Sequence, residues 1–286
     1  MDRLMDEAPA PVGEGREADA VRRIPPAWTV AMLVPLTLVA FFAMAVLWGL
    51  LGPVLIPALQ HNDRLITLTG FFPIELLGVL GPAFLAVRLA KVDVRSVFPL
   101  KPVAPWRVLL MVLATAGMAL VITYLQAWFA HWTHWAYPQE IGELIQAHGP
   151  GDWVLLITAV ALVPALSEEM LTRGYVQSAL VPRVGLWAGI AMTAAIFAVL
   201  HLTPSGIPTY VLLGLWLSVI RHRTGSLWGN IAAHATNNTL AILQANFVPD
   251  SFWGPRAAVM VPLGCVIFVV FAWLSLRGTE RDALPG

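Results

Sequence analysis

Two adjacent carboxylates, Glu168 and Glu169, lie next to a strongly apolar stretch of the chain. Residues 153–166, directly before them, are almost wholly apolar, and an ionised carboxylate in such surroundings costs several kcal/mol unless it is neutralised. On a helix, Glu169 and Arg173 are four residues apart, so they share a face and can form an ion pair. Glu168 lies about 100° from its neighbour around the helix, which leaves it available for chemistry.

Two later apolar segments carry side chains that can act with a glutamate on water. Phe197 and His201 are four residues apart, and so are His234 and Asn238. A glutamate and a histidine can hold and deprotonate a water, and the amide of Asn238 is suited to stabilising an oxyanion. His201, His234 and Glu168 are also an adequate ligand set for zinc with one open position. These residues predict hydrolysis by an activated water, with zinc and metal-free glutamate catalysis as the two alternatives.

Each of these groups alone also has a purely structural explanation. The carboxylate pair with its arginine can be a plain ion pair near the membrane interface, and His201 can be an interfacial residue. His234 and Asn238 can make hydrogen bonds between packed helices. Their occurrence together in three segments that could surround one cavity favours the catalytic explanation.

The composition is that of a membrane protein. Of the 286 residues, 58% are hydrophobic and only 12% are charged, whereas about 25% are charged in soluble domains; the mean hydropathy is +0.74. The net charge of zero gives no indication of a nucleic-acid partner. The one cysteine, Cys265, cannot form an internal disulfide and is expected to be a small buried apolar residue.

Segments long enough to cross a bilayer, which takes about 20 apolar residues, recur along the chain. They predict an all-α, polytopic transmembrane bundle of about eight spans. The candidate spans are residues 27–59, 66–90, 106–129, 153–180, 184–201, 207–220, 227–247 and 257–276. Residues 25–280 are expected to form a single transmembrane domain with its catalytic core at about 153–247. Residues 1–24 are expected to be a disordered cytoplasmic tail.

The distribution of arginine and lysine predicts the orientation. Nearly all clusters of these residues fall on one side of an eight-span arrangement, which places both termini in the cytoplasm. The arginine-rich composition suggests a bacterial inner membrane. On the opposite side, residues 130–152 form a loop in which 139–146 resemble a short amphipathic interfacial helix.

The ordered trio of motifs resembles that of the CPBP family of intramembrane proteases (CAAX protease and bacteriocin-processing, also called Abi), which includes the Ras-converting CAAX endoprotease. The motifs of this family are Glu-Glu-x-x-x-Arg, Phe-x-x-x-His and His-x-x-x-Asn/Asp, on separate membrane helices. This chain has them in the same order at residues 168–173, 197–201 and 234–238. The resemblance covers about residues 153–247.

The resemblance implies a role for each motif residue. Glu168 and His201 would activate the attacking water, and His234 and Asn238 would stabilise the oxyanion or bind a metal. Glu169 and its arginine would hold the site together. If zinc is used, its ligands would be Glu168, His201 and His234.

The predicted function is that of an intramembrane endopeptidase acting on membrane-anchored or transmembrane peptides, including lipid-anchored CAAX-type substrates. Its expected partners are these substrates and the lipid bilayer, with no nucleic acid; no oligomeric state is predicted. One alternative is a non-catalytic membrane scaffold or bacteriocin-immunity protein of the same fold. A proton-coupled transporter is a second alternative, which the crowding of polar groups into the later spans disfavours.

The predicted spans place the motif residues at different depths. Counted from the cytoplasmic ends at about 1.5 Å per residue, His234 lies roughly 12 Å deep, Glu168 roughly 18 Å and His201 up to roughly 27 Å. A single site therefore requires tilted or broken helices around a water-filled cavity. Pro182, Pro204 and Pro208 mark positions where such breaks are expected.

Overall fold

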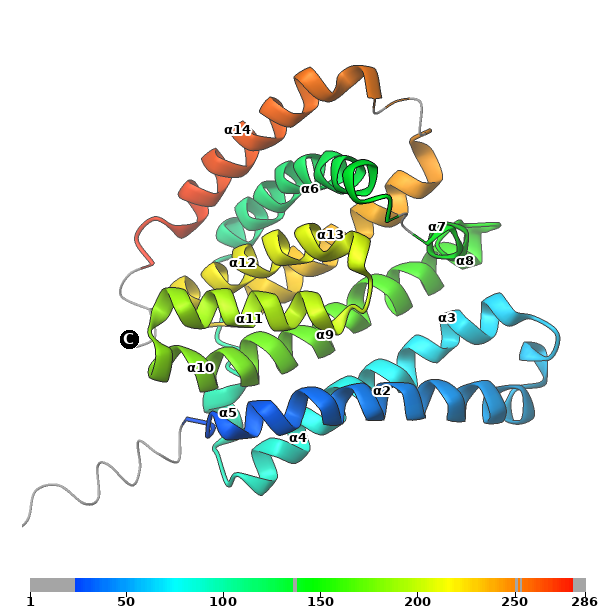
Figure 1. Cartoon of the computed structure of the whole chain (residues 1–286), viewed down its shortest axis with the longest axis horizontal. Helices are drawn as coiled ribbons and strands as arrows, with labels where there is room; N and C mark the ends of the chain where they lie inside the picture. The colour runs from blue at the N-terminus through cyan, green and yellow to red at the C-terminus, as the bar shows by residue number, and fades with distance from the viewer. Residues whose placement is uncertain (1–23, 136–137, 250–251, 253, 280–286) are drawn as a thin grey trace, which may run out of the picture.

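The described part of the chain is a bundle of helices. The computed structural model describes residues 24–135, 138–249, 252 and 254–279, and these residues contain no strand. Figure 1 shows helices stacked roughly parallel to one another. The predicted all-α fold is therefore confirmed. The predicted cytoplasmic tail, residues 1–24, lies outside the described residues except for Ile24.

Each predicted span corresponds to a helical segment. These segments are α2 (Trp28–Leu55), α3 to α4 (Asp63–Leu89), α6 (Pro105–Thr133), α8 to α10 (Pro150–Val184), α11 (Leu186–Leu200), α12 (Ile207–Thr224), α13 (Trp228–Phe247) and α14 (Ala257–Leu276). Five described helical segments are long and apolar enough to cross a membrane, namely the first four and Gly254–Leu276. The protein is thus a helical membrane protein, while the number of eight spans stays a prediction.

Two of the long segments contain π-helical turns. In the second segment, the turn η2 (Ile74–Val79) separates α3 (Asp63–Pro73) from α4 (Leu80–Leu89). The fourth segment has two such turns, and its parts are α8 (Pro150–Leu156), η3 (Ile157–Leu162), α9 (Val163–Glu169), η4 (Met170–Val176) and α10 (Gln177–Val184). Single π turns are rare and occur frequently at functional sites. Here they flank the paired glutamates, which end α9.

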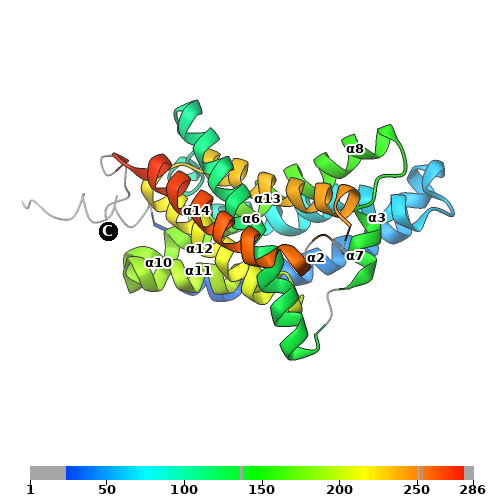
Figure 2. The same ribbon diagram turned by 90° about the horizontal axis from the view of Figure 1, so that it is seen from above.

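The fourth segment lies in the interior of the bundle. In Figure 1, α2, α3 and α4 lie on one side of it, and α11, α12 and α13 lie on the other. Helix α6 packs on α13 and α14, and α14 is the outermost helix of the view. Figure 2 shows the same helices from above, with α14 crossing over α6. This order brings the motif-bearing helices together at the centre.

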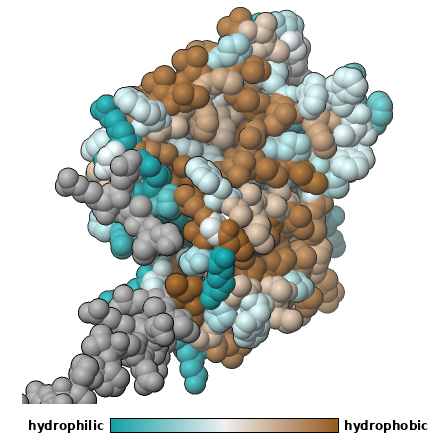
Figure 3. Space-filling view, turned by 60° about the vertical axis from the view of Figure 1, so that its left-hand side comes forward, coloured by the Kyte–Doolittle hydropathy of each residue, from teal (hydrophilic) through white to brown (hydrophobic). Residues whose placement is uncertain are grey.

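The outer surface suits a bilayer. Figure 3 shows that hydrophobic residues cover much of one face, with hydrophilic residues gathered at its left side. Large apolar side chains are widely exposed, among them Val54 (72%) and Leu89 (74%). Exposed apolar surface of this extent is costly in water and favourable in lipid.

Helix α14 approaches α6 through two glycines. A Cβ atom on Gly264 would lie 2.7 Å from the carbonyl oxygen of Gly117, and one on Gly117 would lie 2.6 Å from the amide nitrogen of Phe268. Small residues at both positions allow this close crossing, as is common between membrane helices. The rest of α14 is largely exposed: only 6% of the apolar stretch within Gly254–Leu276 is buried.

Three local expectations meet different outcomes. The short helix expected at 139–146 is present as α7 (Gln139–Leu144). Pro182 lies inside α10, so it does not break the segment as expected; the π turns do so instead. The expectation that Cys265 is buried is wrong, since this residue is exposed on α14.

Candidate active site

The predicted ion pair within the fourth segment is present. The Nη1 atom of Arg173 lies 2.8 Å from Oε1 of Glu169, and both side chains are fully buried. A buried charge needs compensation by a partner and by further hydrogen bonds. The one-turn spacing in the sequence supplies the partner directly.

Helices α11 and α12 complete the surroundings of the buried arginine. Arg173 donates through Nη2 to the carbonyl oxygen of Gly214 at 3.0 Å, and through Nη1 to Oγ1 of Thr172 at 2.9 Å. Its guanidinium lies 4.4 Å from the ring centre of Phe197, a cation–π contact. A Cβ atom on Gly214 would lie 2.9 Å from the Cα atom of Ala194. Glycine therefore permits the approach of α12 to α11 that brings this carbonyl oxygen to the arginine.

Glu169 also holds a histidine from α13. The Nδ1 atom of His234 lies 2.9 Å from Oε1 of Glu169, the same oxygen that binds the arginine. Because a carboxylate only accepts, Nδ1 carries the proton of this hydrogen bond. The other ring nitrogen, Nε2, lies 3.9 Å from Oε2 of Glu168. Glu169 therefore orients His234 toward its neighbour Glu168.

His201, at the end of α11, reaches the same carboxylate. Its Nδ1 atom lies 2.8 Å from the carbonyl oxygen of Phe197, which accepts the Nδ1 proton. Its Nε2 atom lies 3.7 Å from Oε2 of Glu168. The ring stacks on Tyr210 with the ring centres 3.8 Å apart. A backbone carbonyl and an aromatic ring thus fix the orientation of His201.

Oε2 of Glu168 is the atom on which this arrangement converges. It is buried and has no hydrogen-bond partner among the described residues. With Nδ1 protonated in both rings, the Nε2 atoms of His201 and His234 are acceptors, so three acceptors face one another. Their lone pairs repel unless a proton, a donor such as water or a cation lies between them. The site is therefore arranged to bind a donor at this point.

Asn238 lies one turn beyond His234 on α13. Its Nδ2 atom donates to the carbonyl oxygen of Val160 at 3.2 Å. Pro164, four residues after Val160, has no N–H to donate to that carbonyl. The amide of Asn238 therefore docks α13 on the proline-interrupted turn before the glutamates.

Two cavities meet at Glu168. One has a volume of about 260 Å³, and the polar side chains that line it beside Glu168 include Thr123, Gln126, Asn237, Asn238 and Gln244. The other has a volume of about 190 Å³ and is mostly apolar, with Leu38, Phe41, Leu171 and Leu200 in its walls. Both are also lined by Phe71 and Glu75. Glu168 thus lines both a cavity with several polar side chains and a mostly apolar one.

Glu75 belongs to this site, although the motif analysis did not single it out. It lies in the π turn η2, is only 4% exposed, and accepts a hydrogen bond of 2.5 Å from Oγ of Ser167. An acidic residue inside an apolar span is itself a sign of function, and this signal was available within residues 66–90. The sequence alone could not predict that Glu75 lies close to Glu168.

The side chains as placed do not form a metal site. No group of three or more His, Cys, Asp or Glu residues in the described ranges could hold a metal ion. Two ligands of one tetrahedral zinc lie about 3.3 Å apart, whereas Oε2 of Glu168 lies 3.7 Å and 3.9 Å from the two Nε2 atoms. The structure thus brings together the zinc ligands predicted from the sequence, Glu168, His201 and His234, but Oε2 of Glu168 lies farther from the two Nε2 atoms than in a tetrahedral zinc site.

The unequal depths expected from the sequence do not separate the site residues. Helix α11 has 15 residues, which is shorter than the about 20 needed to cross the bilayer. His201, at its end, therefore does not lie far beyond Glu168, and the two side chains are 3.7 Å apart.

Residues 150–240 match the family described as "Type II CAAX prenyl endopeptidase Rce1-like". The match contains all three motifs and confirms the resemblance seen in the sequence over these residues. No curated protein and no solved structure matches the chain. The family that these residues match is described as one of endopeptidases.

Proposed function

We propose that this membrane protein, whose residues 150–240 match the Rce1-like family of type II CAAX prenyl endopeptidases, is an intramembrane endopeptidase that uses Glu168 as its general base. The observation that carries the proposal is the convergence of two histidines on one buried oxygen. The Nε2 atoms of His201 and His234 lie 3.7 Å and 3.9 Å from Oε2 of Glu168.

The first step is the activation of a water between these acceptors. A water has two protons to donate, and it can direct one to Oε2 of Glu168 and the other to Nε2 of His201. Glu168 takes the first proton as the oxygen of the water adds to the carbonyl carbon of the scissile bond. His201 holds the water in line for this attack.

The second step is the stabilisation of the oxyanion that this attack creates. For this step Nε2 of His234 binds one proton from solvent before the substrate enters and keeps it throughout the cycle, so that it donates a hydrogen bond to the oxyanion while Glu169 stabilises the imidazolium through Nδ1 at 2.9 Å. The amide nitrogen of Asn238, which donates one proton to the carbonyl oxygen of Val160 at 3.2 Å, has a second proton to donate to the oxyanion. Glu169 and Arg173 act as positioning residues.

The third step is the cleavage of the carbon–nitrogen bond. The proton that Glu168 took from water passes to the departing nitrogen as this bond breaks. The products are a new carboxyl terminus and a free amine, and the carboxylate of Glu168 is restored. No proton or electron is left over, so the cycle needs no further reactant.

The two cavities favour a peptide substrate that enters from the bilayer. The polar cavity, with Asn237 and Gln244 in its wall, offers hydrogen bonds to a peptide backbone on one side of the scissile bond. The apolar cavity, walled by Leu38 and Leu200, accepts an aliphatic or aromatic side chain on the other side. Because the family description names CAAX prenyl endopeptidases, a farnesylated peptide is one substrate to test, beside unprenylated membrane-anchored peptides.

The test is cleavage of these peptides by the full chain purified in detergent, with Glu168→Gln as the inactive variant. The matched control is Glu140→Gln, which removes an exposed carboxylate of α7. We expect cleavage that Glu168→Gln abolishes and Glu140→Gln leaves unchanged. Cleavage that survives Glu168→Gln in a folded sample would refute the proposed base. A folded wild-type protein that cleaves none of the peptides would favour the scaffold or transporter alternatives.

The same assay tests the zinc alternative. The proposed steps need no metal, so we expect cleavage to persist with 1,10-phenanthroline and the purified protein to contain no stoichiometric zinc. Loss of cleavage with the chelator, restored by added zinc, would instead make Glu168, His201 and His234 the ligands predicted from the sequence. Orientation in the membrane and a bacterial inner-membrane location stay predictions.

A further inference from the structure

Glu75 is a buried carboxyl group that takes no part in the three proposed steps. It lies in the π turn η2 of the candidate membrane span Asp63–Leu89 and is only 4% exposed. Ser167 donates a hydrogen bond to it, but none of the ion pairs among the described residues involves Glu75. A hydroxyl group does not neutralise a carboxylate, and a charge buried inside a span is costly without a partner. Glu75 therefore lacks a counter-charge in the described part of the chain.

Glu75 lies beside the proposed base. Its Oε2 atom is 2.5 Å from Oγ of Ser167, the residue directly before Glu168, and consecutive Cα atoms are about 3.8 Å apart. Glu75 and Glu168 also line the same polar cavity of about 260 Å³. A substrate side chain next to the scissile bond can therefore enter this cavity and reach Glu75.

The polar cavity contains a second buried group that lacks a partner. Thr209 lines it and is only 7% exposed, and its Oγ1 atom has no hydrogen-bond partner among the described residues. Buried polar atoms without a protein partner are rare, and a bound molecule often satisfies them. Gln126 and Gln244 add amide groups to the wall, and the charged side chains among its described residues are Glu75 and Glu168. The cavity is thus polar and acidic.

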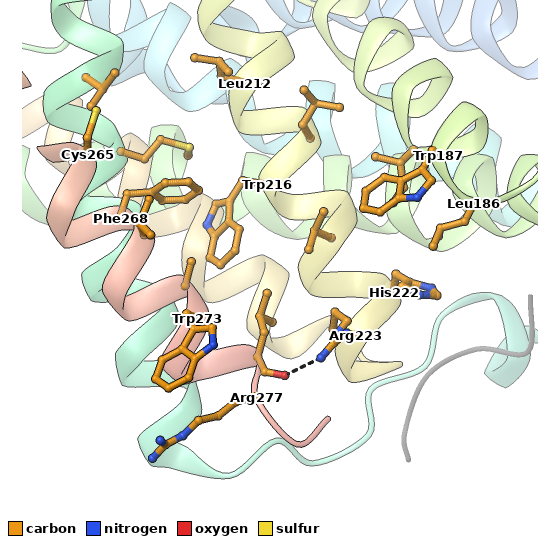
Figure 4. Close-up of a pocket in the computed structure, with 18 of the residues that line it drawn as sticks. Leu186, Trp187, Leu212, Trp216, His222, Arg223, Cys265, Phe268, Trp273 and Arg277 are labelled. Atoms are coloured by element: carbon orange, nitrogen blue, oxygen red, sulfur yellow. Dashed lines mark hydrogen bonds between the residues drawn. The ribbon is translucent and has the colours of Figure 1, made fainter. Parts of the chain in front are cut away.

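A cavity elsewhere in the bundle has a different character. It lies between α11, α12, α6 and α14 and has a volume of about 810 Å³ (Figure 4). Its walls are mainly apolar, its charged side chains include Arg223 and Arg277, and no carboxyl group of the described residues lines it. Acidic side chains are therefore no general feature of the cavities between these helices.

We propose that the polar cavity binds a basic side chain of the peptide substrate, lysine or arginine, with Glu75 as its counter-charge. The inference rests on the proposed peptidase function and names its substrate class, namely peptides with a basic residue next to the scissile bond. A buried ion pair is favourable when further hydrogen bonds satisfy the cation, and the amide and hydroxyl groups of the wall can accept them. A carboxylate in a specificity pocket selects basic side chains in other peptidases as well.

The same arrangement disfavours acidic substrate residues. A carboxylate in the polar cavity would face both Glu75 and Glu168, and like charges placed together weaken binding strongly. His234 and Arg173 do not offset this repulsion, because neither lines the cavity and both are paired with Glu169. The expected order of preference is therefore basic, then neutral, then acidic.

The experiment compares membrane-anchored peptides that differ in one residue next to the cleavage site. The site at which the wild-type chain cuts a parent peptide is located by mass spectrometry, and Lys, Gln or Glu is then placed directly before or directly after it. The kcat/KM of each peptide is measured with the full chain in detergent. At one of the two positions we expect Lys to exceed Gln by about tenfold or more, and Glu to be the poorest.

The outcomes separate this inference from the proposed function. Cleavage with equal kcat/KM for the three residues at both positions would overturn the basic-residue pocket and leave the peptidase standing. A preference for Gln over Lys would also overturn it, since a neutral side chain would then occupy the cavity. If the folded wild-type chain cleaves no peptide, the proposed function and this inference fail together.

Glu75→Gln tests whether Glu75 supplies the counter-charge. Glutamine keeps an oxygen that can accept from Ser167 but removes the charge. The ratio of kcat/KM for the Lys and Gln peptides should fall to about one, whatever the overall activity of the variant. The control is Thr123→Val, which removes a polar group from the same cavity without a change in charge and should keep the ratio. A ratio that survives Glu75→Gln would overturn the role of Glu75.

Discussion

Ser167 donates a hydrogen bond of 2.5 Å from Oγ to Oε2 of Glu75, and this contact joins segments 92 residues apart in the chain. Ser167 directly precedes Glu168, and Glu75 and Glu168 line the same two cavities. Both partners of the bond are almost completely buried. The contact therefore fixes the turn that carries the proposed base, which makes Ser167 and Glu75 positioning residues.

Ser167→Ala should reduce both stability and cleavage. The substitution leaves the buried carboxyl of Glu75 without this donor, which costs about 1–3 kcal/mol. The measurements are thermal unfolding in detergent and the kcat of peptide cleavage. Ser275→Ala is the control, because Ser275 is also buried and its hydroxyl donates within its own helix, to the carbonyl oxygen of Ala272. Equal effects of the two substitutions on kcat would argue against a positioning role.

Glu168→Gln should abolish cleavage and leave the fold intact. Removal of a general base costs typically 10²–10⁴ in rate, and Oε2 of Glu168 makes no hydrogen bond among the described residues that the fold would lose. The measurement is kcat/KM together with thermal unfolding. The smallest expected loss of kcat/KM is about 100-fold. A variant whose kcat/KM stays within about threefold of the wild-type value, far from that loss, would show that Glu168 is not the general base.

Glu169→Gln should destabilise the protein strongly as well as inactivate it. It leaves the fully buried Arg173 without its counter-charge, which costs about 3–5 kcal/mol. The double variant Glu169→Gln/Arg173→Met should regain part of this stability but no activity, because His234 still lacks the carboxylate that orients it. Thermal unfolding and cleavage of the wild type and of both variants test this. Recovery of activity in the double variant would show that His234 does not need Glu169.

Tyr210→Ala should lower kcat by loosening His201. The two rings stack with their centres 3.8 Å apart, and an aromatic pair contributes about 0.5–1.5 kcal/mol, or roughly 2- to 13-fold in rate. Tyr210→Phe keeps the ring and should retain more activity than the alanine variant. Cleavage rates of both variants test this, and equal losses would assign the effect to the hydroxyl group instead.

Local patterns in the chain determined much of this molecule. The i,i+4 spacing of Glu169 and Arg173 predicted their ion pair, because that contact depends only on the helix that carries both. The apolar segments predicted the helices and the membrane, since the cost of exposing apolar surface to water is a property of composition. The three motifs predicted the family resemblance, which the match over residues 150–240 confirms.

Only the tertiary structure decided which atoms meet. The rotation and tilt of α9, α11 and α13 depend on packing contacts such as that at Gly214, and no periodicity contains them. Those contacts place the Nε2 atoms of His201 and His234 beside Oε2 of Glu168. They also bring Glu75 to Ser167 across 92 residues. A sequence fixes which face of its own helix a side chain occupies, whereas contact between helices depends on how they pack in space.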